Sequence, residues 1–241
     1  MNIFILLFPI DNFFLFLHLF DVHRNTFAEE NKGVKLNKED SYDANVKVVD
    51  KLLSNVIEKL KALQVLEKTI VVIMADHGEC LGEGGRNTHG FTLLDIEFGI
   101  PLIIAGPGIK QKRIKQMCRS IDVVPTILDL LKIVPKIKPD GISLINNKEE
   151  IDEVYLEGCL TFLEIRGIRT KKWKYIIERN KDETLYDLSK DPEETKNVIE
   201  QNKGIANQLR ERVKNHFAKK SREQETDEHT KEMLRNLGYL D

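Results

Sequence analysis

The sequence predicts an α/β fold: a mostly parallel central sheet with helices on both faces, followed by a small antiparallel α+β subdomain. In the first part of the chain, short aliphatic runs with no polar position alternate with amphipathic helical segments. This pattern is typical of strands that are buried on both faces of a parallel sheet and connected through helices. After about Ser143 the strands become shorter and more alternating, which indicates antiparallel pairing.

The first predicted strand is the aromatic run Phe13–Phe20. The apolar start of the chain leaves a secretory or membrane-anchor segment as an alternative. Two features oppose it. No basic residue precedes Arg24, and Pro9 and Asp11 divide the apolar run into halves shorter than the roughly 18 residues that a spanning helix needs. We therefore expect a buried strand and no membrane association. No convincing signal peptide is present, so the compartment stays open, with the cytoplasm favoured.

Four further elements complete the predicted large domain. Apolar residues recur at steps of three and four over Ser41–Leu66, which predicts a long helix with one apolar face and with Asp40 or Ser41 as its N-cap. The runs Ile70–Ala75 and Ile100–Gly106 contain no charged residue and predict two more buried strands. A short helix with a proline in its first turn is expected over Asp122–Ile133.

The small subdomain is predicted to combine antiparallel strands with a final helix. Its strands are expected at Val154–Glu157, Leu163–Arg169 and Trp173–Glu178. Asp191–Glu194 has the composition of a helix start, and apolar residues at helical spacing predict a last amphipathic helix that ends near Phe217. The predicted organisation is therefore residues 1–145 for the large α/β domain, 146–217 for the subdomain, and 218–241 for a charged linker and tail.

The composition excludes several functional classes. Of the 241 residues, 41% are hydrophobic and 32% are charged, so the chain can bury a core and is not wholly disordered. The formal net charge of −2 provides no basic field, so we expect no nucleic-acid partner. The three cysteines, Cys80, Cys118 and Cys159, form no C-x-x-C pair, which argues against a disulfide scaffold and a cysteine-based zinc site.

Residues able to carry chemistry lie at the ends of the predicted strands. Asp76 and His77 directly follow the second buried strand, His89 precedes the third, and His23 follows the first, two residues after Asp21. A carboxylate binds a hard divalent cation, and an imidazole can bind a metal or donate to an anionic oxygen. For one such motif alone, a turn cap and a packed histidine are the simpler interpretation. Histidines at three strand ends favour a site for a tetrahedral oxyanion next to a metal.

Nine segments then carry a family resemblance by their order and spacing. They are FFLFLHLFDVH (13–23), the predicted helix with Tyr42 and Val49-Asp50, TIVVIMADHGECLGEGG (69–85), THGFTLLDIEFGIPLIIAGPGI (88–109), SIDVVPTILDLLKI (120–133), DGISL (140–144), IRTKKWKYI (168–176), LYDLSKDPEETKNV (185–198) and LRNLGYLD (234–241). The chain resembles the C-terminal part of a sulfatase, a member of the alkaline phosphatase superfamily. The resemblance implies an alkaline phosphatase-like sheet, here incomplete, and metal-dependent hydrolysis of sulfuric esters. The implied metal is divalent, usually calcium, with magnesium as the alternative.

The resemblance implies a role for each strand-end residue. Asp76 corresponds to a metal ligand, and His77 corresponds to the residue beside it at the metal and the nucleophile. His23 corresponds to a histidine that points at the sulfate. His89 takes the position of a lysine or histidine that holds a sulfate oxygen and neutralises charge on the leaving group. His23, His77 and His89 are therefore the expected catalytic residues, with His23 and His89 in contact with the substrate.

The sequence departs from the family pattern at the nucleophile. Sulfatases use a formylglycine made from Cys or Ser within C/S-x-P-S-R, and neither this string nor the aspartate pair of the family's first strand is found in this sequence. We therefore expect a truncated or split member that is inactive by itself. Its expected partners are a sulfate-ester small molecule or glycan and the missing N-terminal half, acting in trans. Formylglycine is expected only in that missing part.

Two alternatives remain beside the sulfatase interpretation. Relatives in the same superfamily cleave phosphate mono- and diesters, although the segments 185–188 and 191–197 favour the sulfatase branch. An upstream Thr or Ser nucleophile without P-S-R would favour phosphate esters. The second alternative is a non-catalytic fragment or binding module. The natural substrate and the oligomeric state are not specified by the sequence.

Overall fold

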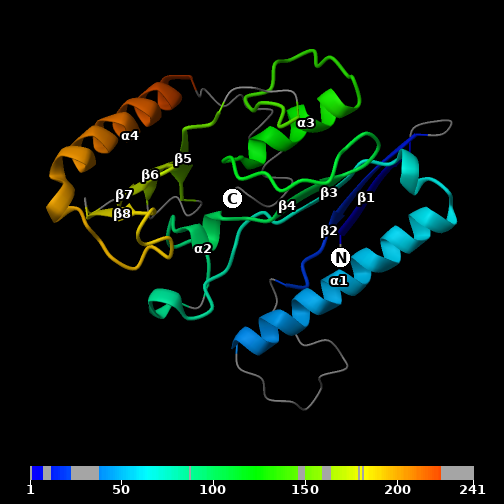
Figure 1. Ribbon diagram of the computed structural model, residues 1–241, viewed down its shortest axis with the longest axis horizontal. Helices are drawn as coiled ribbons and strands as arrows, with labels where there is room; N and C mark the ends of the chain where they lie inside the picture. The colour runs from blue at the N-terminus through cyan, green and yellow to red at the C-terminus, as the bar shows by residue number, and fades with distance from the viewer. Residues whose placement is uncertain are drawn as a thin grey trace. The chain divides into compact units, whose positions relative to one another are not determined.

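The computed structural model describes residues 2–7, 12–22, 38–86, 88–145, 150–158, 164–178, 180 and 182–223. These residues form two compact units (Figure 1). The first contains the described residues of Met1–Met74, Leu81–Glu83 and Pro101–Gln111, and the second contains those of Ala75–Cys80, Gly84–Ile100 and Lys112–Asp241. These two units do not coincide with the domains predicted on either side of residue 145. That domain boundary stays a prediction. Each unit is described by itself.

The first unit consists of two strand pairs and a long helix. Strand β1 (Asn2–Leu7) pairs with β2 (Phe13–His18), and β3 (Val71–Met74) pairs with β4 (Leu102–Ala105). Helix α1 (Lys38–Ala62) has acidic residues in its first turn and basic residues in its last, which complements the helix dipole, and the short helix η2 (Leu66–Lys68) follows it. Because α1 begins at Lys38, neither Asp40 nor Ser41 is its N-cap, and Ser41 is buried within the helix.

The predicted strands of this unit are present, with two corrections. Strands β3 and β4 are antiparallel, as are all the strand pairs among the described residues, so the expected parallel pairing is not observed there. An uncharged aliphatic run indicates burial but does not specify direction. The strands are also less buried than predicted: Phe16 is 51% exposed and Ile103 is 57% exposed. The reason is that within the described residues β2 and β4 each have one hydrogen-bonded neighbour.

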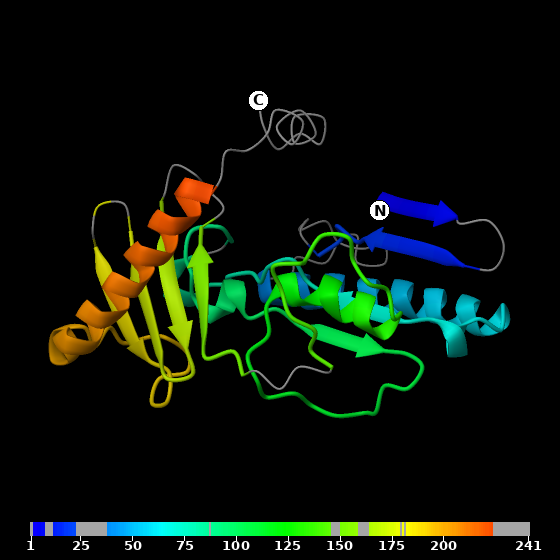
Figure 2. The same cartoon turned by 90° about the horizontal axis from the view of Figure 1, so that it is seen from above.

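The second unit is built on a four-stranded antiparallel sheet. The strands β5 (Glu153–Glu157), β6 (Arg166–Thr170), β7 (Trp173–Ile177) and β8 (Glu183–Asp187) adjoin in chain order. After the short helix η5 (Glu200–Asn202), helix α4 (Lys203–Glu223) lies across one face of the sheet (Figure 2). The structure confirms the antiparallel strands and the final helix, and it adds β8, which the sequence analysis did not predict.

Both faces of this sheet are buried. The core on the α4 side consists of Ile168, Tyr175, Leu185, Ala206, Leu209, Val213 and Phe217. On the opposite face, Ile176 and its neighbours pack against Leu93, which is fully buried and precedes helix α2 (Asp95–Phe98). Gly167 permits this contact, since a Cβ there would lie 3.2 Å from Leu93 Cδ1 and 2.7 Å from the carbonyl oxygen of Tyr175. Burial of Leu93 contributes about 1.5–3 kcal/mol to holding this segment on the sheet.

One other prediction for the second unit was wrong. Asp191–Glu194 forms a turn instead of a helix start: Asp191 accepts hydrogen bonds from the Thr195 hydroxyl and the Lys196 N–H. Glu194 has a φ of 55°, which no α-helix tolerates in its interior. Helix α4 continues to Glu223, so residues 218–223 of the predicted charged segment are helical. The rest of the predicted tail, residues 224–241, lies outside the described residues.

The predicted short helix is present in two pieces. The 3₁₀ helix η4 (Ser120–Asp122) leads into α3 (Val123–Leu130), and Pro125 lies in the first turn of α3. Asp122 is completely buried, and its carboxylate accepts a hydrogen bond from the Arg119 backbone N–H at 2.8 Å. Its other oxygen accepts the Ile142 N–H at 2.9 Å, which ties the start of the helix to the loop that follows it.

Candidate active site

Asp76 and His77 follow β3 in an irregular loop, as the sequence predicts. Asp76 Oδ1 accepts the backbone N–H of His77 at 3.0 Å. His77 Nδ1 donates to the carbonyl oxygen of Gly78 at 2.8 Å, and His77 Nε2 lies 3.8 Å from Asp76 Oδ2. Both side chains are exposed, so the loop presents a carboxylate and an imidazole side by side to solvent.

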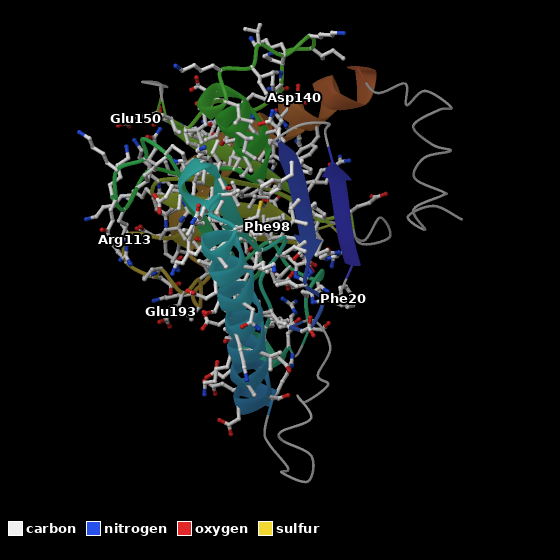
Figure 3. The ribbon with its side chains drawn as sticks, turned by 90° about the vertical axis from the view of Figure 1, so that its right-hand side faces the viewer. Phe20, Phe98, Arg113, Asp140, Glu150 and Glu193 are labelled. Carbon is white, nitrogen blue, oxygen red and sulfur yellow. The ribbon has the colours of Figure 1, made fainter. Side chains whose placement is uncertain are left out.

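Gly78 allows this loop to lie directly against α2. Its N–H donates to the carbonyl oxygen of Glu97 at 2.7 Å. A Cβ on Gly78 would lie 2.0 Å from the carbonyl oxygen of Ile96, so any other residue would push the backbone away. Phe98, at the end of α2, has a partly exposed side chain (Figure 3).

His89 lies beside His77, although a glycine-containing loop with the short helix η3 (Glu83–Gly85) separates the two residues in the chain. The His89 and His77 rings stack, with centroids 3.9 Å apart and an interplanar angle of 30°. His89 Nδ1 lies 2.7 Å from Glu79 Oε2, and both of these side chains are partly buried. The structure therefore brings Asp76, His77 and His89 into one cluster, with Glu79 as an additional member.

Glu97 joins the two loops that carry the histidines. It is 2% exposed, and its Oε2 accepts the backbone N–H of Gly90 at 2.7 Å. Its Oε1 accepts a hydrogen bond from the buried thiol of Cys80 at 3.6 Å. Because Glu97 also binds Gly78 through its carbonyl oxygen, one residue of α2 holds the backbone beside both His77 and His89. A charged residue at this depth requires such hydrogen bonds.

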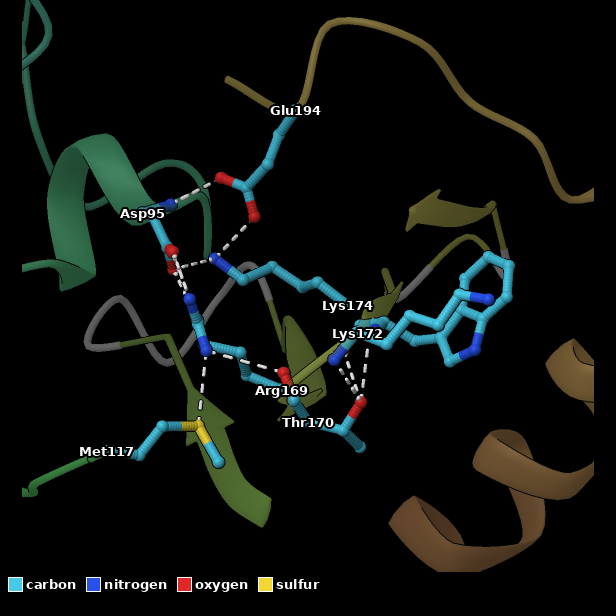
Figure 4. Close-up of polar contacts among 8 residues, drawn as sticks. Asp95, Met117, Arg169, Thr170, Lys172, Lys174 and Glu194 are labelled. Carbon is cyan, nitrogen blue, oxygen red and sulfur yellow. Dashed lines mark hydrogen bonds and ion pairs between the residues drawn. The ribbon is translucent and has the colours of Figure 1, made fainter. Parts of the chain in front are cut away.

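Helix α2 is in turn attached to the C-terminal sheet by a buried polar network (Figure 4). Lys174 of β7, whose side chain is completely buried, lies with its Nζ 2.5 Å from Asp95 Oδ1 and 2.6 Å from Glu194 Oε1. Arg169 of β6 binds both oxygens of Asp95, and its Nη1 contacts the Met117 sulfur at 3.1 Å. Glu194 Oε2 accepts the Asp95 N–H at 2.5 Å. Two acids and two bases thus neutralise one another between α2 and the sheet.

The two acids of this network respond differently to burial. Burial raises the pKa of Asp95, but its contacts with Arg169 and Lys174 outweigh this effect and hold the pKa below its usual value. For Glu194, burial dominates over the nearby ammonium of Lys174, so its pKa is raised. The network is therefore sensitive to the loss of either cation.

The donor set can supply part of a metal site. Asp76 offers a carboxylate oxygen, and His77 offers an imidazole nitrogen, whereas calcium takes about six to eight oxygen ligands. Within the described residues, no group of three or more His, Cys, Asp or Glu side chains is arranged to hold a metal ion. Asp76 and His77 fit two positions of a larger coordination sphere, whose remaining ligands must come from outside these residues.

Comparison with known proteins identifies the fold and the family. Residues 9–133 match the sulfatase family, and residues 90–223 match the family of N-sulphoglucosamine sulphohydrolase C-terminal regions. The first of these matches covers half of the chain. The chain belongs to the sulfatase family. The resemblance expected from the sequence is thereby confirmed, and so is the sulfatase type of hydrolase to which the chain is related.

Several curated sulfatases are similar to this chain. Choline-sulfatase of Rhizobium meliloti is 32% identical over 176 residues, which are 70% of this chain and 34% of that protein. Delta 4,5-hexuronate-2-O-sulfatase of Bacteroides thetaiotaomicron is 33% identical over 168 residues, 63% of this chain and 35% of that protein. Arylsulfatase K of Homo sapiens is 30% identical over 175 residues, 65% of this chain and 32% of that protein. The sulfatase chain thus spans about a third of the length of these relatives.

Solved structures confirm the α/β, alkaline phosphatase-like class. A 2-O GAG sulfatase matches with a TM-score of 0.68 and 28% identity over 78% of this chain and 45% of that chain. A second structure, solved with its substrate D-glucosamine-2-N,6-O-disulfate, matches with a TM-score of 0.62 and 25% identity over 78% of this chain and 42% of that chain. Phosphonate monoester hydrolase of Agrobacterium radiobacter, at 22% identity and a TM-score of 0.62, shows the shared fold alone.

The structure brings together three of the side chains that the sequence predicts for the site, Asp76, His77 and His89, whereas His23 lies outside the described residues. Their roles stay a prediction. The sequence analysis did not name Glu79 and Glu97. Glu79 stands within the strand-end motif itself, where a second carboxylate near a histidine was the available signal. Among the described residues, no helix has the length and hydrophobicity needed to cross a membrane.

Proposed function

We propose that this chain provides the oxyanion-binding and leaving-group side of a sulfatase active site that hydrolyses sulfuric esters. The observation that supports the proposal is the stacked pair His77 and His89 beside Asp76, at the end of β3 in a sulfatase fold. Two cationic or N–H-donating rings next to a carboxylate suit a site where an anionic group meets a metal. His23 is proposed as a third donor toward the sulfate.

Each residue has a distinct proposed task. His77 lies beside Asp76 and is proposed to face the metal and the nucleophile. His89 holds another oxygen and neutralises the negative charge that develops on the leaving group as the ester bond breaks. Fixed donors of this kind act mainly on the transition state, because their orientation requires no rearrangement when charge develops. A bound divalent cation would supply Lewis-acid stabilisation of the same charge.

Calcium, with magnesium as the alternative, is the proposed metal, and Asp76 is proposed as its ligand in this chain. Because the described donors fill only part of a coordination sphere, we expect calcium to bind with a Kd of about 10⁻⁴ M or weaker, in the range of low-affinity sites. Asp76→Asn should abolish the calorimetric signal of calcium titration. Glu193→Gln, which neutralises an exposed acid elsewhere, should leave it unchanged. Tight calcium binding that persists in Asp76→Asn contradicts the assignment.

The proposed substrate is a sulfated small molecule or glycan. Support comes from the names of the relatives, which include a choline-sulfatase and a hexuronate-2-O-sulfatase, and from the glucosamine disulfate substrate of a solved neighbour. The nucleophile is proposed to lie in an N-terminal sulfatase half that joins this chain. The partly exposed apolar side chains of β2 and β4 are consistent with such a partner, since strands with open faces and edges invite pairing.

The decisive experiment supplies the missing half. The N-terminal portion of the Bacteroides hexuronate sulfatase, matured to formylglycine, is fused before residue 9 of this chain, where the family match begins. We expect the isolated chain to release no sulfate from aryl or glycan sulfates and the fusion to release it. His89→Ala should slow the fusion by about 10²–10³-fold, the usual cost of losing one transition-state donor.

The matched control is His216→Ala. His216 lies in α4, where its ring stacks on Tyr155 with centroids 3.7 Å apart, so its loss should leave turnover nearly unchanged. Phosphate mono- and diesters are assayed in parallel. Faster cleavage of phosphate esters than of sulfate esters would identify the site as one for phosphate-ester hydrolysis. A folded fusion that turns over neither class would identify the chain as a non-catalytic module.

A further inference from the structure

Glu79 has no part in the chemistry proposed above, yet its carboxylate makes the shortest described contact of the histidine pair. Its Oε2 lies 2.7 Å from His89 Nδ1. Both side chains are partly buried, at 16% exposure for Glu79 and 22% for His89, so solvent competes less for this hydrogen bond than it would on an open surface.

The chemistry of the two groups determines where the ring proton lies. An ionised carboxylate can only accept hydrogen bonds, and a neutral imidazole carries one N–H. The hydrogen bond to Glu79 therefore requires the ring proton on Nδ1 of His89. Nε2 is the nitrogen that does not contact Glu79. His77 shows the same assignment, because its Nδ1 donates to the carbonyl oxygen of Gly78 at 2.8 Å. Both stacked rings thus direct Nδ1 to the protein.

We infer that Glu79 is a positioning residue: it accepts the Nδ1–H of His89 and so fixes the orientation and tautomer of the ring. Nε2 is then the nitrogen that takes the second ring proton, and in that form it donates to an oxyanion. The oxyanion part of this inference rests on the proposed function, whereas the tautomer does not. A carboxylate that orients a histidine in this way is common in catalytic and metal sites, since it removes rotational freedom from the acting nitrogen.

The neighbouring contacts do not replace Glu79. Glu97 holds the backbone N–H of Gly90, next to His89 in the chain, and so limits the backbone without selecting a ring nitrogen. Stacking on His77 fixes the plane of the ring, but a flip about χ2 would keep that plane while it exchanged Nδ1 with Cδ2 and Nε2 with Cε1. Among the described contacts of His89, the one with the Glu79 carboxylate distinguishes these two orientations and places the proton on Nδ1.

The test measures the tautomer directly in the intact chain. Histidine is labelled with ¹⁵N, and long-range ¹H–¹⁵N correlation spectra, which distinguish a protonated from an unprotonated ring nitrogen, are recorded in an alkaline buffer. His89→Gln assigns the signals. We expect a protonated Nδ1 for His89 in the wild type. In Glu79→Ala we expect the Nε2–H form, which an unconstrained imidazole prefers, and Glu79→Gln should retain Nδ1–H because its amide oxygen can accept the same hydrogen bond.

A control variant and a sulfate titration distinguish the positioning role of Glu79 from the proposed oxyanion binding by His89. Glu67→Ala, which removes an exposed acid of η2, should change nothing at His89. If Glu79→Ala does not fold, Glu79→Asp replaces it, since its carboxylate is one methylene too short for the contact. Inorganic sulfate is then titrated into each protein in a mildly acidic buffer, and we expect the His89 shift that it causes to be lost in Glu79→Ala.

The outcomes are distinct. A His89 ring protonated on Nε2 in the wild type, or an Nδ1–H form that persists in Glu79→Ala, overturns the inference. An Nδ1–H form that depends on Glu79 supports it. If that dependence holds but sulfate and sulfate monoesters leave His89 unperturbed in the wild type, the positioning role stands and the proposed oxyanion function of the site fails.

Discussion

Lys174→Met is expected to lower the free energy of unfolding by about 3–5 kcal/mol, the usual cost of removing one partner from a buried ion pair. The Lys174 side chain is completely buried and lies within 2.6 Å of both Asp95 and Glu194. Methionine has a similar length and fills the space, so the loss is electrostatic and does not come from a cavity. Urea denaturation followed by circular dichroism measures it.

Lys171→Met is the matched control from the same hairpin. Lys171 forms ion pairs with Glu150 and Asp152, but all three side chains are mostly exposed. Exposed pairs contribute little to stability, since solvent and salt screen them. Equal losses for the two variants would show that the buried network does not hold α2 to the sheet, and a stable Lys174→Met protein would contradict the prediction outright.

The loss of unfolding free energy in Lys174→Met should also depend on pH. The pKa of Asp95 is lowered in the folded protein, so its ionised form contributes stability above its unfolded pKa, and this contribution disappears as the pH falls through the folded pKa. The pKa of Glu194 is raised, so its contribution has the opposite sign and is lost as the pH rises. Without Lys174, Glu194 loses its ammonium partner, whereas Asp95 keeps its contact with Arg169. The difference between wild type and Lys174→Met should therefore be smaller near pH 4 than at pH 7.

Sequence reasoning located the site because strand ends are visible in a sequence. The uncharged run before Asp76 ends abruptly at a polar motif, and the next histidine, His89, precedes another such run. Asp76 follows β3 and His89 precedes β4, and these two strands are antiparallel, so the end of β3 and the start of β4 lie at the same edge of the pair. A parallel pair would have placed these two ends at opposite edges.

The errors arose where tertiary contacts override local signals. Asp191–Glu194 has the composition of a helix start, but Glu194 is drawn to Lys174 and to the Asp95 N–H, and its φ of 55° ends any helical path. Glu97 looks like one more surface acid in the sequence, yet it is buried because the Gly90 N–H and the Cys80 thiol need an acceptor. Partners more than a few residues away leave no local pattern in a single sequence.

A similar loss is expected from Asp122→Ala, which should lower the free energy of unfolding by about 3 kcal/mol. Asp122 is fully buried, and its carboxylate accepts hydrogen bonds from the Arg119 side chain, Nη2 at 2.8 Å and Nε at 3.2 Å, as well as from two backbone N–H groups. Removing it leaves the N–H groups of Arg119 and Ile142 without this acceptor. The start of α3 and the loop after it should loosen together.

The pH dependence of stability provides a second test of the role of Asp122. Burial raises its pKa, but the Arg119 guanidinium and the two backbone N–H groups outweigh burial, so the folded pKa lies below the usual value. Its stabilisation is therefore present above the unfolded pKa and is lost as the pH falls through the folded value. Wild type should lose stability on acidification from pH 5 to pH 3 more steeply than Asp122→Ala. Asp140→Asn, an exposed acid of the adjoining loop, should follow the wild-type curve. Parallel curves for wild type and Asp122→Ala would mean that this carboxylate does not anchor α3.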